Sequence, residues 1–144
     1  MDQTVEAIAH LIREKVNPSQ FEQLIGWYFE RAGATLVELP SKNERDKKGD
    51  ADIIATFDPI RTIIYVQAKH HVGEEDDWAV QQVMAYKEQK AVDSDYTRVA
   101  WVISMCDRFS EKCMALAEEN DVMLFDGKAF AELLLNAGIS GMRV

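Results

Sequence analysis

The chain has 144 residues, of which 47% are hydrophobic and 28% charged, a composition typical of one globular domain. Its formal net charge of −9 argues against a general affinity for nucleic acid, so any surface that binds a polyanion must be local. No apolar run approaches the roughly 20 residues of a membrane span, and the N-terminus lacks the basic start and the cleavage site of a signal peptide.

Two helices are predicted at the start of the chain. Residues 4–16 place apolar side chains at helical spacing. Asn17 and Pro18 then separate this helix from a second one over residues 18–32. Asparagine suits the cap position, proline suits the first helical position, and Gln20 stands where a capping box needs its second member.

The middle of the chain predicts a three-stranded antiparallel unit. Apolar runs at 34–39, 51–57 and 62–69 read as strands. Asp58 and Pro59 suit a tight turn, since proline pre-sets one backbone angle and aspartate accepts turn hydrogen bonds. The second and third strands should therefore form a hairpin.

The remaining segments predict alternating helices and strands. The continuous apolar run at 98–104 indicates a strand buried on both faces, and Ser110 is a suitable helix cap. The expected elements are a helix at about 77–92, a strand at 98–104, a helix at 110–120, a strand at 122–126 and a helix at 128–137. This order predicts an α/β fold with a mixed sheet of about five strands, flanked by helices on both faces.

Cysteine usage predicts a reduced protein. Cys106 and Cys113 are the two cysteines of the chain, and no second pair completes a zinc site. Two thiols in a domain of this size are typical of structural, reduced cysteines, which favours the cytoplasm.

The predicted hairpin brings together residues that suit a metal site. Side chains alternate along a strand, so Gln67 and Lys69 point to one face. Asp52 should lie roughly opposite Gln67 and Ala68, at the same end of the hairpin. A carboxylate with neutral oxygen ligands suits Mg²⁺, and a lysine beside it can orient water or stabilise charge on a phosphate.

Three short motifs carry a family resemblance. Phe21-Glu22 in an early helix, "KKGDADIIA" at the second strand and "YVQAKHH" at the end of the third resemble the PD-(D/E)xK nuclease superfamily, and within it the Mrr-like restriction endonucleases. The resemblance covers roughly residues 19–136. Two departures stand out: the usual D-G-G-x-D is replaced by K-K-G-D-A-D, with Asp50 as a possible substitute, and Gln67 occupies a position where most members have an acid.

The resemblance implies a role for each matching residue. Asp52 corresponds to the metal-binding acid, Gln67 to the second metal ligand and Lys69 to the catalytic lysine. Glu22 corresponds to a helix carboxylate that binds the metal or orients a water, and the Ala68 carbonyl to a further ligand. It also implies a restriction-endonuclease-like fold and Mg²⁺, or alternatively Mn²⁺, as cofactor. We expect one domain over residues 1–144, with a helical extension at 1–17 and the core at 18–137.

Candidate DNA contacts come from the loop before the second strand and from the neighbourhood of Lys69. They are Lys42, Arg45, Lys47, Lys48, His70 and Gln82. Basic side chains contact phosphates without regard to sequence. The alternative interpretation is a solvated loop and a polar helix face, and Asp52 alone would be an ordinary strand-start acid.

The leading hypothesis is a Mg²⁺-dependent DNA endonuclease acting in restriction, defence or repair. Cutting both strands would need two sites, so we expect a homodimer, with target choice supplied by a separate domain or subunit. The first alternative is a catalytically inactive DNA-binding or scaffold domain, favoured by the acidic charge and by Gln67. The second is a flavodoxin-like small-ligand protein, which the absence of G-x-G-x-x-G and P-loop motifs disfavours.

Overall fold

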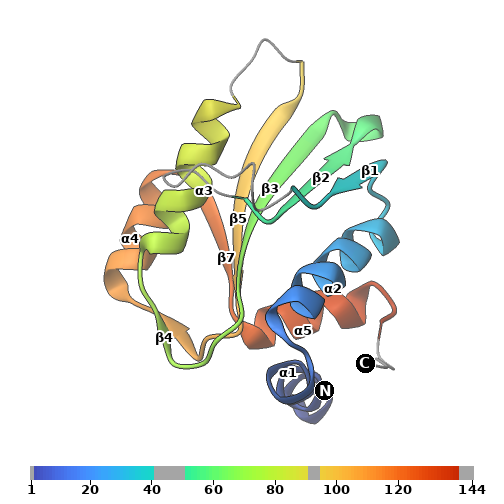
Figure 1. Ribbon diagram of the computed structural model, residues 1–144, viewed down its shortest axis with the longest axis vertical. Helices are drawn as coiled ribbons and strands as arrows, with labels where there is room; N and C mark the ends of the chain where they lie inside the picture. The colour runs from blue at the N-terminus through green and yellow to red at the C-terminus, as the bar shows by residue number, and fades with distance from the viewer. Residues whose placement is uncertain (1, 41–50, 91–94, 140–144) are drawn as a thin grey trace.

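One five-stranded sheet lies between two layers of helices (Figure 1). The computed structural model describes residues 2–40, 51–90 and 95–139. The strand order is β1-β2-β3-β5-β7. These strands are β1 (Leu36–Glu38), β2 (Ile53–Phe57), β3 (Thr62–Lys69), β5 (Thr97–Ser104) and β7 (Val122–Phe125). The predicted mixed α/β sheet of about five strands is confirmed.

The sheet combines an antiparallel half with a parallel half. β1 pairs with β2 and β2 with β3 in antiparallel fashion, as the predicted hairpin requires. β3, β5 and β7 are parallel neighbours. The turn between β2 and β3 is one 3₁₀ turn, Asp58–Ile60, closed by Arg61 in the left-handed region at φ 48°. The start of β2 and the carboxyl ends of β3, β5 and β7 therefore share one edge of the sheet.

Helices cover both faces of this sheet, as expected. α1 (Asp2–Lys15), α2 (Pro18–Arg31) and α5 (Gly127–Asn136) lie on one face, and α3 (Trp78–Gln89) and α4 (Glu111–Glu119) on the other (Figure 1). Each face has its own buried apolar cluster, the first around Phe21, Phe29 and Phe130 and the second around Val83 and Val102. None of the helices in the described ranges has the length and apolar character needed to span a bilayer.

Local sequence signals explain where several helices begin. Asn17 Oδ1 accepts from the Gln20 N–H at 2.8 Å, and Gln20 Oε1 accepts from the Asn17 N–H at 3.0 Å, so the predicted capping box is confirmed. Ser110 Oγ accepts from the Cys113 N–H at 3.0 Å and caps α4, also as predicted. These side chains satisfy backbone donors that a helix start leaves without partners.

A small second sheet was not predicted. β4 (Glu74–Glu75) and β6 (Arg108–Phe109) pair in parallel just beyond the ends of β3 and β5. Neither segment was expected to form a strand. The ladder is two residues long, so no periodic pattern in the sequence could indicate it.

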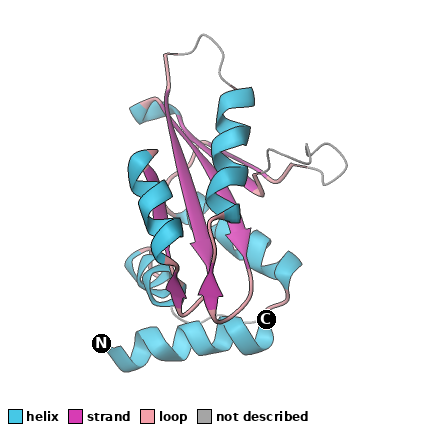
Figure 2. Ribbon diagram, turned by 90° about the vertical axis from the view of Figure 1, so that its left-hand side faces the viewer, coloured by secondary structure: helices cyan, strands magenta, loops and turns pink. Residues whose placement is uncertain are grey.

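Helix α1 lies across the carboxyl edge of the main sheet (Figure 2). The Arg13 guanidinium donates from Nε to the Met105 carbonyl at 3.1 Å and from Nη2 to the Cys106 carbonyl at 3.4 Å. Gly127 makes room for this group, because a Cβ there would lie 2.7 Å from Arg13 Nη2. α1 also contributes buried side chains to the α5 core. The division into an extension at 1–17 and a core at 18–137 stays a prediction.

Arg13→Ala is expected to lower the free energy of unfolding by about 1–2 kcal/mol, because two carbonyls following β5 lose a charged donor. Urea unfolding followed by circular dichroism measures the change. Arg31→Ala is the matched control, since the contact of its guanidinium within the described chain is one exposed hydrogen bond to the Ala137 carbonyl at 3.5 Å. Equal losses in the two variants would contradict a special role for the Arg13 contacts.

Candidate active site

Buried polar side chains gather in one region of the molecule. In the described ranges, the buried polar or charged residues are Asp52, Gln67, Glu75, Gln82 and Ser104. These five residues lie on the α3–α4 side of the sheet or at its carboxyl edge. Strand alternation, the packing of α3 and the hydrogen bonds of the residues themselves all place them there. Polar groups are rarely buried without a specific use. The cluster therefore marks the candidate site.

Asp52 stands immediately before β2 and is 2% exposed. Its Oδ2 accepts a hydrogen bond from the Ala68 N–H at 2.8 Å, and its own N–H donates to the Val66 carbonyl at 2.7 Å. The β2–β3 register ends with Ile53 opposite Val66, so Asp52 lies beside the end of β3, where the Ala68 N–H reaches its carboxylate. The predicted meeting of the acid with the end of β3 is thus what the structure shows.

Gln67 and Ala68 add two neutral oxygens beside this carboxylate. Gln67 is 2% exposed, and its Oε1 has no hydrogen-bond partner in the part of the chain that the structure describes. The Ala68 carbonyl projects to the same side of β3 as its N–H, toward Asp52. A buried oxygen without a donor costs about 1–3 kcal/mol. A bound cation would remove that cost, so these residues fit a divalent metal.

The described residues hold no group of three or more His, Cys, Asp and Glu side chains suited to a metal. The candidate ligands differ from such a group, because they are one carboxylate (Asp52), one side-chain amide oxygen (Gln67) and one peptide oxygen (Ala68). Mg²⁺ accepts ligands of this kind and keeps several waters in its shell. The chemistry of the donors thus favours a hard, weakly held cation over zinc.

Lys69 ends β3 on the same face as Gln67 and is half-buried. Its carbonyl accepts from the Met105 N–H at 3.0 Å, which fixes its backbone to the end of β5. Its ammonium makes no ion pair with any described residue. The structure therefore places Lys69 at the end of β3, two residues from Gln67, with no counter-ion among the described residues.

Glu22 lies in the turn of α2 that adjoins the end of β3. The neighbouring Phe21 ring is 5.2 Å from the His70 ring, centroid to centroid, and His70 directly follows β3. Glu22 itself is half-buried. Its predicted role at a metal site stays a prediction.

The predicted DNA contacts divide into two groups. Lys42, Arg45, Lys47 and Lys48, together with Asp50, lie outside the described residues. His70 and Gln82 are described, and both are turned inward. His70 Nε2 lies 2.9 Å from the Ile12 carbonyl, and Gln82 is 9% exposed, with no described residue bonding to its Oε1. Their contact with DNA stays a prediction.

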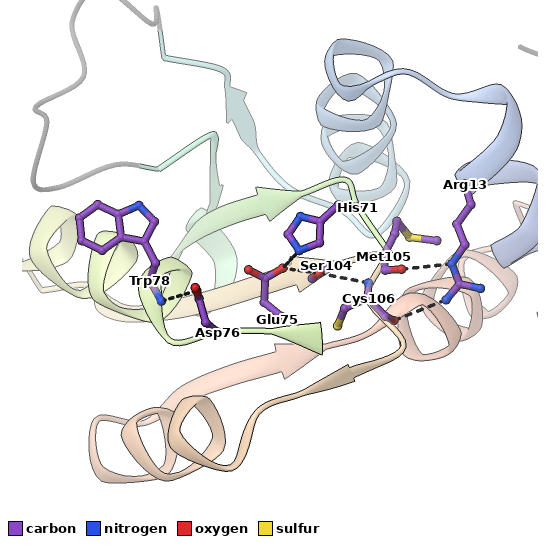
Figure 3. Close-up of polar contacts among 8 residues, drawn as sticks. All are labelled: Arg13, His71, Glu75, Asp76, Trp78, Ser104, Met105 and Cys106. Atoms are coloured by element: carbon purple, nitrogen blue, oxygen red, sulfur yellow. Dashed lines mark hydrogen bonds and ion pairs between the residues drawn. The ribbon is translucent and has the colours of Figure 1, made fainter. Parts of the chain in front are cut away.

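Glu75 and Ser104 are candidate site residues that the sequence did not reveal (Figure 3). Ser104 Oγ donates to Glu75 Oε1 at 2.7 Å, and His71 Nε2 lies 2.9 Å from the same oxygen. Glu75 was hidden in a run of four acids. Ser104 carried a weak signal, because it is a polar residue at the carboxyl end of an apolar central strand, where α/β sheets bind ligands.

A hollow of about 740 Å³ opens on the α3–α4 face of β2 and β3. Its floor includes Ile54 and Thr56 on β2 and Ile63 and Tyr65 on β3. Ile54 and Tyr65 lie two residues from Asp52 and Gln67 along their strands, on the same face of the sheet.

The two cysteines are buried and free, and their thiols are not nucleophiles. Burial raises the pKa of the Cys113 thiol to about 11, and burial also raises the pKa of Cys106. At neutral pH both thiols stay protonated, and only a thiolate attacks.

Comparisons with known proteins give one family and one solved structure. The Mrr_cat family model, described as "Restriction endonuclease", matches residues 13–134. The MspJI restriction endonuclease, solved in complex with a 27-mer oligonucleotide, is similar in structure with a TM-score of 0.54 and 14% sequence identity. The match covers 96% of this chain and 32% of the MspJI chain, and it shows the likeness of the fold. No curated protein sequence matches.

Proposed function

Because the chain belongs to the restriction endonuclease family, we propose that it is a Mg²⁺-dependent endonuclease that hydrolyses phosphodiester bonds of DNA. The observation that carries the proposal is the meeting of Asp52, Gln67 and Lys69 at one end of the β2–β3 hairpin. Family membership makes the reaction class expected, and this juxtaposition supplies the residues for it.

Each residue has a defined task in the proposed reaction. Asp52 supplies a carboxylate oxygen, Gln67 an amide oxygen and Ala68 a peptide oxygen to hold Mg²⁺, with Mn²⁺ as a substitute. Glu22 would orient a water from α2. The cation supplies Lewis-acid stabilisation of charge on the phosphate. The Lys69 ammonium orients the attacking water and offsets the negative charge that grows on the phosphate oxygens.

DNA as substrate is supported by the family and by the fold shared with a protein solved on an oligonucleotide. The chain spans about a third of the MspJI chain, so target choice by a further domain or subunit is part of the proposal. Cleavage of both strands needs two copies of the site, which we propose a homodimer provides. The net charge of −9 confines the DNA surface to a local patch.

Incubation of supercoiled plasmid with the protein and Mg²⁺ or Mn²⁺ tests the proposal. Nicked or linear product that disappears on chelation supports the nuclease. Retained DNA binding without cleavage would contradict it and favour the inactive DNA-binding domain, for which the neutral Gln67 is the motivating observation.

Gln67→Glu is expected to tighten Mg²⁺ binding by about tenfold, because a second carboxylate adds charge to the ligand set. Isothermal titration calorimetry measures the dissociation constant in both proteins. Gln89→Glu, at an exposed position of α3, adds the same charge away from the site and should leave the constant unchanged. An equal affinity in wild type and Gln67→Glu would show that residue 67 is not a ligand.

A further inference from the structure

Glu75 is a buried carboxylate at the carboxyl edge of the sheet that the proposed reaction leaves without a task. The four consecutive acids around it behave differently from one another. Glu74 pairs with Arg108, Asp76 accepts from the Trp78 N–H, and Asp77 pairs with Lys112, all at the surface or half-buried. Glu75 alone of the four is buried, at 3% exposure. An ionised carboxylate is costly to bury, so its place calls for an explanation.

Two neighbouring side chains contact the Glu75 carboxyl group (Figure 3). Ser104 Oγ accepts from the Cys106 N–H at 3.2 Å, so its own proton is available to Glu75 Oε1, 2.7 Å away. His71 Nε2, 2.9 Å from the same oxygen, must carry a proton to donate to it. Glu75 is thereby tied both to the end of β5 and to the segment that follows β3.

These contacts place the Glu75 carboxyl group one hydrogen bond from Ser104, the register partner of Lys69. Ser104 is the register partner of Lys69 in the parallel β3–β5 pair, so the two side chains project from one face on strands about 4.8 Å apart. The Glu75 carboxylate is one hydrogen bond beyond Ser104. Asp52 occupies the corresponding position on the β2 side of β3. The end of β3 is thus flanked by a buried carboxylate on either side.

We infer that Glu75 is a positioning residue for Lys69. Its negative charge, fixed by Ser104 and His71, restricts the Lys69 ammonium to the carboxyl edge of β3, where the phosphate would bind. Glu75 also returns to this region the negative charge that Gln67 lacks. The inference rests on the proposed function, because that function gives Lys69 its role.

The test compares Glu75→Gln with Glu74→Gln. Glutamine keeps an oxygen for Ser104 and removes the charge, and Glu74 is the exposed neighbour that serves as the matched control. Glu75→Gln is expected to lower kcat for DNA cleavage by about 10²-fold with KM for DNA unchanged, as misplacement of one catalytic group does. Glu74→Gln should leave kcat within about twofold.

A second readout does not depend on cleavage. Reductive methylation with carbon-13 formaldehyde labels lysine amines, and loss of one NMR resonance in Lys69→Arg identifies the Lys69 signal. The signal should move in Glu75→Gln and stay in place in Glu74→Gln. Should Glu75→Gln fail to fold, Ser104→Ala frees the same carboxylate from β5 and should also move the signal.

The outcomes separate the inference from the proposed function. An unmoved Lys69 signal in every folded variant, or full kcat in Glu75→Gln, overturns the positioning role. If the Lys69 signal moves in Glu75→Gln but the wild-type protein cuts no DNA, the positioning of Lys69 by Glu75 stands and the nuclease function is overturned.

Discussion

Lys69→Ala is expected to slow DNA cleavage by about 10²–10³-fold, the usual effect of removing one charge-stabilising group from an active site. The ammonium is half-buried, lies on the same face as Gln67 and is not neutralised by any described residue. Its charge is therefore available to a phosphate. Single-turnover cleavage at saturating Mg²⁺ measures the effect on the chemical step.

The fold should survive this substitution, because the lysine side chain makes no ion pair within the described chain and surface truncations change stability by about 0.5 kcal/mol or less. Lys112→Ala is the control for loss of one positive charge, because Lys112 is 81% exposed and pairs with Asp77. Cleavage by Lys69→Ala within about threefold of wild type would remove this residue from the mechanism.

We expect Mg²⁺ to raise the melting temperature of the wild-type protein, and we expect Asp52→Asn to abolish that rise and to slow cleavage by about 10³-fold or more. The amide oxygen of asparagine can still accept from the Ala68 N–H, now held by Oδ2 at 2.8 Å. What the variant loses is the negative charge that we propose binds the cation. A ligand that binds only the folded state stabilises it according to its affinity, so loss of binding removes that stabilisation.

Differential scanning fluorimetry across a Mg²⁺ titration measures this effect without any need for cleavage. Asp58→Asn is the matched control, because Asp58 lies at the opposite end of the same hairpin and bonds to the Tyr96 hydroxyl. A melting temperature that still climbs with Mg²⁺ in Asp52→Asn, as steeply as in wild type, would place the cation elsewhere.

The parts of the fold that could be predicted from the sequence rest on strong local signals. Asn17 and Gln20 define the start of α2 by a capping box, and Pro59 with the flanking apolar runs defines the hairpin. The alternation rule then places Gln67 and Lys69 on one face and Asp52 opposite Gln67. These conclusions need only short-range chemistry, and the register agrees with them.

The rest of the candidate site depends on contacts between distant parts of the chain. Glu75 is buried because β4 pairs with β6, more than thirty residues later in the chain (Glu74 with Arg108), and its Ser104 partner ends a different strand. A run of four acids gives no sign of which member turns inward. The same holds for α1, whose Arg13 reaches carbonyls at Met105 and Cys106 that no periodicity connects to it.

The antiparallel pairing of β2 with β3 has a consequence for how this arrangement can vary among homologues. Asp52 and Lys69 sit at the open end of the ribbon, while the Asp58–Ile60 turn sits at the closed end. Adding residues at the tip lengthens the two arms together and leaves the acid and the lysine facing each other. A single residue inserted inside one arm would instead invert every side chain beyond it. The number of residues between the counterparts of Asp52 and Lys69 should therefore differ among homologues of this protein only by insertions or deletions in the turn of the hairpin.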